Sequence, residues 1–266
     1  MKINQLAIVL LILSFSFIAC EENPPMEDGI FSLSFSRNGD TGEAVDGFPV
    51  FENNEGRKFY FENFSFYVSE ITLFKENGES MKLIRESDSS DVILYDWVDV
   101  RTDNEGDRLF QNFDVPAGTY TGISFGIGVP EVPNHSDPTN YPAEHPLSEF
   151  RGKHWTWNAG YRFIMADGFI DDSDAKDGPM DLGFKYHLGM DTLYRNLEFK
   201  GANDGFEVKS GSTYTYGFDL DPTKMFYNAN ESVDMVNDNI THTGDFFSVA
   251  KAVADNFVNN ALSKKE

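Results

Sequence analysis

Two short stretches of the sequence combine histidine with aromatic residues in a way that could hold a metal ion. The first contains His154, Trp155 and Trp157, and the second contains His187. Imidazole nitrogens bind copper, zinc, iron and nickel, whereas an intact indole ring is a poor ligand. By residue type alone, an ordinary aromatic core strand with structural histidines is the favoured interpretation, and a metal site with an aromatic wall is the alternative.

Two more histidines lie in a long irregular segment, residues 130–153, that is rich in proline. They are His135 and His145. A connection of this length without a secondary structure of its own is usually functional or covers another part of the fold. We therefore keep both histidines as further candidate ligands.

The candidate ligands must be positioned by strands. If residues 154–163 are extended, Trp155 and Trp157 share one face, and His154 points to the other unless a bulge intervenes. His187 similarly faces away from its apolar neighbours Tyr186 and Leu188. We expect the face with the two tryptophans to meet His187.

Most of the chain has the pattern of short strands separated by turns. Strand-like patterns occur at residues 31–36, 64–74, 92–97, 119–129, 154–166, 182–188, 195–200 and 212–220. The alternation shifts phase near Ser69 and Glu70, which predicts a β-bulge. Glycines line one face of residues 119–129, which predicts a close contact with that backbone. The pattern favours an all-β fold, with antiparallel sheets forming a β-sandwich or jelly roll.

The end of the chain has the spacing of an amphipathic helix. Apolar residues recur every three or four positions between residues 245 and 263. Asp245 or Thr243 could cap this helix. We expect it to pack on the sheets.

The beginning of the chain has the pattern of a lipoprotein signal. An apolar run follows Lys2 and ends at Ala19-Cys20, which predicts a signal peptide over residues 1–19. Cys20 is the only cysteine, at the position where a lipid would be attached. Residues 20–29 are polar and predict a tether, followed by one domain over residues 30–266. We expect an outer-membrane lipoprotein, on either the periplasmic face or the cell surface.

The negative charge argues against nucleic acid as a partner and leaves cations as possible partners. The formal net charge is −23, which argues against binding nucleic acid. Five aspartates between residues 171 and 181 could attract Ca²⁺, but their spacing favours a solvated acidic loop. The chain contains none of the common hydrolase, phosphate-loop or metalloprotease motifs. We therefore expect a binding protein rather than an enzyme.

The order of several motifs resembles the MbnP-like copper-binding family, and the similarity extends over most of the chain from about Phe31. The motifs are His145-Pro146-Leu147, the Trp155 to Phe163 segment, Tyr186-His187-Leu188-Gly189, the Phe64 to Ile71 strand and Ala254-Asp255-Asn256-Phe257. The double tryptophan followed by Gly-Tyr is the most specific of these.

The resemblance implies Cu(I) as the metal and an unusual ligand. In that family one tryptophan near the double-Trp segment is oxidised to kynurenine by a dihaem peroxidase-like (MbnH-like) partner, and histidine completes the site. His187 is the best single ligand that the resemblance implies here. Either Trp155 or Trp157 could be the modified residue.

The sequence also departs from the family pattern. Arg37 stands where relatives have a histidine after the first strand, and arginine does not bind copper. Weak copper binding, replacement by His135 or His145, and loss of binding are the alternatives. The alternative function is a surface β-sandwich that binds a glycan or an envelope protein, with an exposed Trp97 or Tyr141 beside a groove.

Overall fold

The structure is a computed structural model that describes residues 28–85, 90–98, 108–156, 159–242, 244 and 247–265. The predicted signal peptide, Cys20, Trp157, the predicted helix caps and the side chain of Trp97 lie outside the described part. No helix in the described part is long and apolar enough to cross a membrane.

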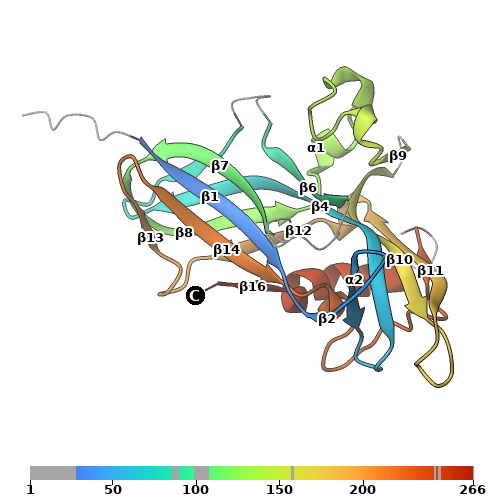
Figure 1. Ribbon diagram of the computed structural model, residues 1–266. Coiled ribbons are helices and arrows are strands. Elements are labelled where there is room, and N and C mark those ends of the chain that lie inside the picture. Colours follow the sequence, from blue (N-terminus) through green and yellow to red (C-terminus); the bar gives the residue numbers. More distant parts are fainter. Residues whose placement is uncertain are drawn as a thin grey trace, which may run out of the picture.

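The chain folds into two β-sheets, as predicted (Figure 1). The smaller sheet has the order β16-β14-β1-β7. Its strands are β1 (Asp28–Arg37), β7 (Arg108–Pro116), β14 (Thr213–Leu220) and β16 (Leu262–Lys264). Because β1 begins at Asp28, the last two residues that we expected in the tether belong to a strand. Strands β1 and β14 run parallel, whereas β1 and β7 are antiparallel.

The larger sheet is built around one long strand, β4. Its main path is β12-β8-β4-β10-β11-β15, and six short strands attach to it. The main strands are β4 (Lys58–Lys75), β8 (Gly118–Ile127), β10 (Gly160–Asp171), β11 (Met180–Gly189), β12 (Arg195–Phe199) and β15 (Ile240–Thr241). The short ones are β2 (Asp40–Val45), β3 (Phe48–Glu52), β5 (Ser80–Lys82), β6 (Val92–Val98), β9 (His154–Thr156) and β13 (Phe206–Val208).

The core lies between the two sheets and is dominated by phenylalanine. The ring of Phe35 on β1 lies 5.2 Å from that of Phe66 on β4 and 6.2 Å from that of Phe125 on β8. All three side chains are fully buried. Aromatic pairs at these distances contribute about 1 kcal/mol each beyond the burial of their area. These rings come from both sheets, and their packing holds the two sheets face to face.

Two local irregularities of the larger sheet were predicted and are confirmed. Glu70 has φ 53°, and the pairing of β4 with β8 shifts register between Ser69 and Thr72, so a bulge lies there. The glycine face of β8 is covered closely, because a Cβ at Gly126 would lie 1.8 Å from the Tyr194 hydroxyl. Glycine is therefore required where this ring crosses the strand.

The C-terminal helix is shorter than predicted. The α-helix α2 spans Phe247–Asn256 and continues as one π-helical segment, η5 (Phe257–Ala261). The last two residues of the predicted helix, Leu262 and Ser263, instead belong to β16 and pair with β14. Phe257 is fully buried, with its ring 5.2 Å from that of Phe66. Hydrogen bonding to the edge of the smaller sheet ends the helix early.

Residues 130–156, which we call the covering segment, lie on the outer face of the larger sheet. They contain α1 (Glu131–Asn134), two 3-10 turns, η1 (Pro138–Asn140) and η2 (Glu149–Arg151), and β9. Tyr67 faces away from the core, yet it is fully buried and its hydroxyl donates to the Pro146 carbonyl at 2.8 Å. The long proline-rich segment therefore covers this face of the sheet, which is one of the two roles predicted for it. Two further 3-10 turns, η3 (Asp191–Leu193) and η4 (Pro222–Met225), connect strands elsewhere.

Candidate metal centre

One tryptophan and two histidines meet on the outer face of the larger sheet. The ring of Trp155 lies 6.1 Å from that of His187 and 5.6 Å from that of His242. The two imidazole rings lie 5.3 Å apart. Together with Asp167, these residues form what we call the Trp155 cluster. The predicted meeting of Trp155 with His187 is confirmed.

Strand pairing explains how residues far apart in sequence reach the cluster. Strands β11 and β15 run parallel, with Tyr186 opposite Thr241. The residues that follow these two, His187 and His242, are therefore also neighbours. Strand β9 returns antiparallel to the start of β10 and carries Trp155 over this part of the sheet. The cluster thus depends on the long-range pairing of β11 with β15 and on the local hairpin between β9 and β10.

A carboxylate orients one of the imidazoles. His187 Nε2 and Asp167 Oδ1 are 2.7 Å apart, and both side chains are mostly buried, with exposed fractions of 12% and 20%. In a neutral ring the proton then lies on Nε2, since a carboxylate only accepts, and Nδ1 keeps its lone pair. Metal-binding histidines commonly have such a carboxylate partner, which fixes the ring and its tautomer.

A guanidinium group covers the tryptophan. The Arg162 guanidinium carbon lies 5.2 Å from the centre of the Trp155 ring, which is a favourable cation–π distance. Burial lowers the pKa of Arg162, partly opposed by Asp167. Its Nη1 donates to the Gly152 carbonyl, whereas its buried Nε has no hydrogen-bond partner in the described part of the chain. A buried donor next to the indole is therefore left without an acceptor.

The other predicted histidines have different partners. His154 lies on the opposite face of β9 from Trp155, edge-on to Tyr161 at 4.9 Å, and burial lowers its pKa. His135 Nε2 is 2.8 Å from Asp191 Oδ2. His145 is buried, and its Nδ1 accepts from the Leu147 amide. The prediction that these three could be ligands is thus not supported by their contacts.

Arg37 and Tyr141, on which the alternative predictions for copper binding and glycan binding depend, also contact other side chains. Arg37 ends β1, and its guanidinium lies over the buried Phe51 ring at 5.9 Å. Arg37 therefore lies against the core and not in the Trp155 cluster. The ring of Tyr141 stacks on that of His145 at 4.2 Å, so one of its faces is covered.

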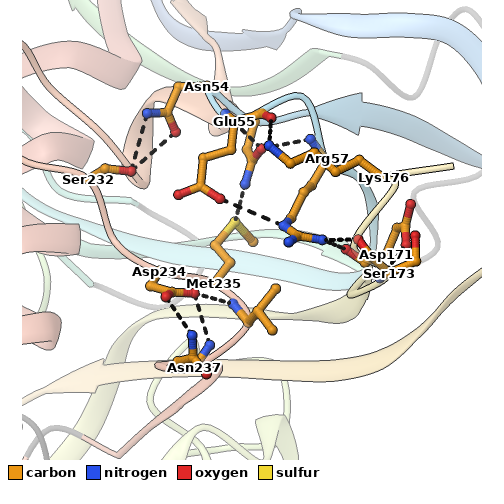
Figure 2. Close-up of polar contacts among 12 residues, drawn as sticks. Asn54, Glu55, Arg57, Asp171, Ser173, Lys176, Ser232, Asp234, Met235 and Asn237 are labelled. Carbon is orange, nitrogen blue, oxygen red and sulfur yellow. Dashed lines mark hydrogen bonds and ion pairs between the residues drawn. The ribbon is translucent and has the colours of Figure 1, made fainter. Parts of the chain in front are cut away.

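The aspartates near residue 171 hold loops together (Figure 2). Asp171 accepts from the backbone amides of Ser173 and Gly178. A hydrogen bond from the Ser173 side chain, helped by these two amides, holds the pKa of the Asp171 carboxyl below its usual value against the effect of burial. Arg57 donates to the backbone carbonyls of Asp171 and Ser173, as Figure 2 shows. The solvated-loop interpretation therefore fits better than a calcium site.

Copper fits the Trp155 cluster better than a metal that needs many ligands. In the described part of the chain no three His, Cys, Asp or Glu side chains form a metal-binding group. Two imidazoles that share one ion through bonds of about 2 Å have ring centres roughly 5 to 6 Å apart. The two rings here satisfy that distance. Cu(I) accepts few ligands and prefers imidazole and soft donors.

The fold and this cluster together define a protein of the β-sandwich class with a histidine–tryptophan cluster on the outer face of its larger sheet. The family model of MbnP matches residues 29–243, and the chain therefore belongs to the MbnP family. The matched range contains Trp155, His187 and His242.

The fold of a solved relative agrees with this assignment. The structure of MbnP from Methylosinus trichosporium is similar, with a TM-score of 0.53 and 14% sequence identity. The similarity covers 78% of this chain and 80% of that one. At this identity the likeness supports the fold alone. No curated protein sequence matches the chain.

Proposed function

We propose that this protein binds Cu(I) at the cell envelope, between His187 and His242 and beneath Trp155, for copper uptake, storage or delivery. The proposal rests on the family and on one observation, the meeting of the Trp155 indole on β9 with the imidazoles of His187 on β11 and His242 just after β15. His242 thereby takes the place of the histidine that relatives have where this chain has Arg37.

Each residue of the cluster has a distinct part in this proposal. Copper would supply a soft Lewis-acid centre, and the neutral imidazoles of His187 and His242 would hold it. Asp167 keeps the His187 ring in one orientation and tautomer. Trp155 and Arg162 exclude water from one side of the site. His242 is exposed, which leaves a path for the ion to enter.

We further propose that Trp155 is the residue oxidised to kynurenine by a dihaem peroxidase-like partner. Trp155 contacts both imidazoles, so a ketone or aryl amine produced there would lie beside the ion. The buried Nε of Arg162 supports the choice, because it could donate to a new carbonyl oxygen that the intact indole lacks.

The proposed location is the outer membrane. Cys20 would carry the lipid, residues from Glu21 onward would form the tether, and one domain would follow. The periplasmic face and the cell surface are both compatible with this arrangement.

Glycan or envelope-protein binding is the alternative. An aromatic platform for a sugar needs an open ring face. The outward-facing rings of Phe48, Tyr60 and Phe169 instead stack on one another, at 5.5 and 5.7 Å. They cover each other's faces, which gives the alternative no specific support.

The test is a Cu(I) titration against a chromophoric chelator under reducing conditions. We expect about one copper per chain for the wild type. His187→Gln and His242→Gln should each weaken binding by roughly a hundredfold or more, since each removes a direct ligand and changes around metal sites commonly cost tenfold to a hundredfold. His135→Gln, outside the cluster, is the matched control and should bind like the wild type.

Peptide mass spectrometry of protein purified from its native host tests the modification. The mass of kynurenine at Trp155 would support the proposal. Unmodified Trp155, in cells shown to express the oxidising partner, would refute the modification. Equal copper affinity for wild type and both cluster variants would refute the copper site itself.

A further inference from the structure

We propose that the thioether sulfur of Met165 is a third donor to the ion held by His187 and His242. This inference rests on the proposed function, since it adds a ligand to the same site. It also gives the site a selectivity for soft monovalent ions that two imidazoles alone would not have.

Strand register places Met165 beside His187. Met165 on β10 is directly opposite His187 on β11 and directly opposite Ser65 on β4. Its neighbours Ile164 and Ala166 are buried towards the core, so Met165 itself faces outwards, as His187 does. Side chains directly opposite in an antiparallel pair have Cβ atoms about 5 Å apart. Met165, His187 and His242 therefore form a row across three neighbouring strands.

The covering segment encloses this row. Met165 is only 6% exposed although it points away from the core. On one side of it, Lys153 Nζ donates to Ser65 Oγ at 2.9 Å, and on the other, Trp155 contacts His187. Residues 153–155 of the covering segment therefore lie on the same outer face as Met165, which is buried there. The sulfur is thus shielded from bulk water beside an imidazole whose Nε2 is already occupied by Asp167.

The chemistry of methionine suits this position. Its side chain has three rotatable bonds and a polarisable sulfur, so it can adjust to an ion a few ångströms away. A neutral thioether binds Cu(I) well and Zn²⁺ or Ca²⁺ poorly. Two neutral imidazoles and a thioether would hold a monovalent ion with Asp167 as the nearby negative charge. A leucine would fill the same space without providing a donor.

Cu K-edge X-ray absorption of the Cu(I)-loaded protein tests the inference, with Met165→Leu and Met81→Leu compared with the wild type. Met81 lies on β5 of the same sheet and is the matched control. We expect a sulfur shell at about 2.3 Å in the wild type and the control that disappears in Met165→Leu. We also expect Cu(I) affinity to fall by roughly tenfold or more in that variant, with its melting temperature little changed.

A second measurement does not depend on the variant. With methyl-¹³C methionine in the wild-type protein, Ag(I) should shift the Met165 methyl resonance at one equivalent, whereas Zn²⁺ should not. If copper binds with nitrogen neighbours alone and the Met165 resonance does not move, the thioether ligand is refuted while the copper site stands. If the wild type binds neither Cu(I) nor Ag(I), both the ligand and the proposed function are refuted.

Discussion

Lys153 fixes the covering segment just before Trp155, and its replacement by methionine should destabilise the fold strongly. Lys153 is 5% exposed. Its Nζ lies 2.9 Å from Ser65 Oγ and 3.3 Å from Asp96 Oδ2. Lys153→Met keeps most of the buried alkyl chain but removes the charge and both contacts.

The size of the effect follows from the burial of the pair. Removing one partner of a buried ion pair costs about 3 to 5 kcal/mol, because the other charge is left without compensation. The Asp96 side chain is 26% exposed, and Arg151 also stabilises its charge. We therefore expect a loss near the lower end, about 3 kcal/mol at pH 7.

The loss should depend on pH in a defined direction. Burial raises the pKa of Asp96 above its usual value, although Lys153 and Arg151 pull it down. Without Lys153 the pKa of Asp96 in the folded protein rises further. A raised folded-state pKa means that protonation favours the fold, so the deficit should shrink as pH falls from 7 through that pKa.

Urea denaturation of the two proteins at pH 7 and at mildly acidic pH measures both effects. The same substitution in an Asp96→Asn background should cost much less, since no buried charge is then left behind. An equal cost in both backgrounds, or a deficit that grows towards acidic pH, would show that the Lys153–Asp96 interaction does not anchor the segment.

Three further changes have definite expected outcomes. Asp167→Ala should lower Cu(I) affinity roughly tenfold or more by releasing the His187 ring, whereas the exposed Asp172→Ala should not, and equal chelator titrations would contradict the orienting role. Gly126→Ala should cost about 2 kcal/mol in urea denaturation because its Cβ would meet the Tyr194 hydroxyl; Gly183→Ala, whose Cβ would lie 3.8 Å from the Phe169 ring, is the control, and equal stabilities would refute the close contact. Phe257→Ala should cost about 4 kcal/mol in the same assay, since its fully buried ring packs on Phe66, and a loss below about 1 kcal/mol would mean that η5 is not part of the core.

Local patterns in the sequence predicted several of the strands that bury one face. The alternation of Phe31, Leu33 and Phe35 identified β1, and the phase shift at Ser69 identified the bulge in β4. Strand β7 was missed although Phe113 and Val115 are buried on one of its faces. Strand β2 was missed because it is almost entirely exposed and has no apolar alternation, and β3 was missed because its buried residues are consecutive instead of alternating.

The candidate site was predicted only in part for a different reason. Trp155 and His187 stand in recognisable motifs, whereas His242 follows a strand of two residues, Ile240–Thr241, with no motif around it. Its place beside His187 comes from a parallel pairing between residues more than fifty positions apart. Nothing in the sequence around Asp167 marks it as a partner of His187. Strand pairing places Asp167 opposite Lys185, on the same face of β11 as His187, and the two side chains meet there. The family match extends to residue 243, and it is therefore the sequence evidence that includes His242.

The most direct test of the copper site is anomalous diffraction at the copper edge from crystals of the Cu(I)-loaded protein. The account predicts one peak between His187 and His242, beneath Trp155 and within bonding distance of an imidazole nitrogen of each. A peak at His135, at His145 or in the loop around Asp171 would contradict it. So would the absence of a peak in crystals grown from protein that binds one copper per chain in solution.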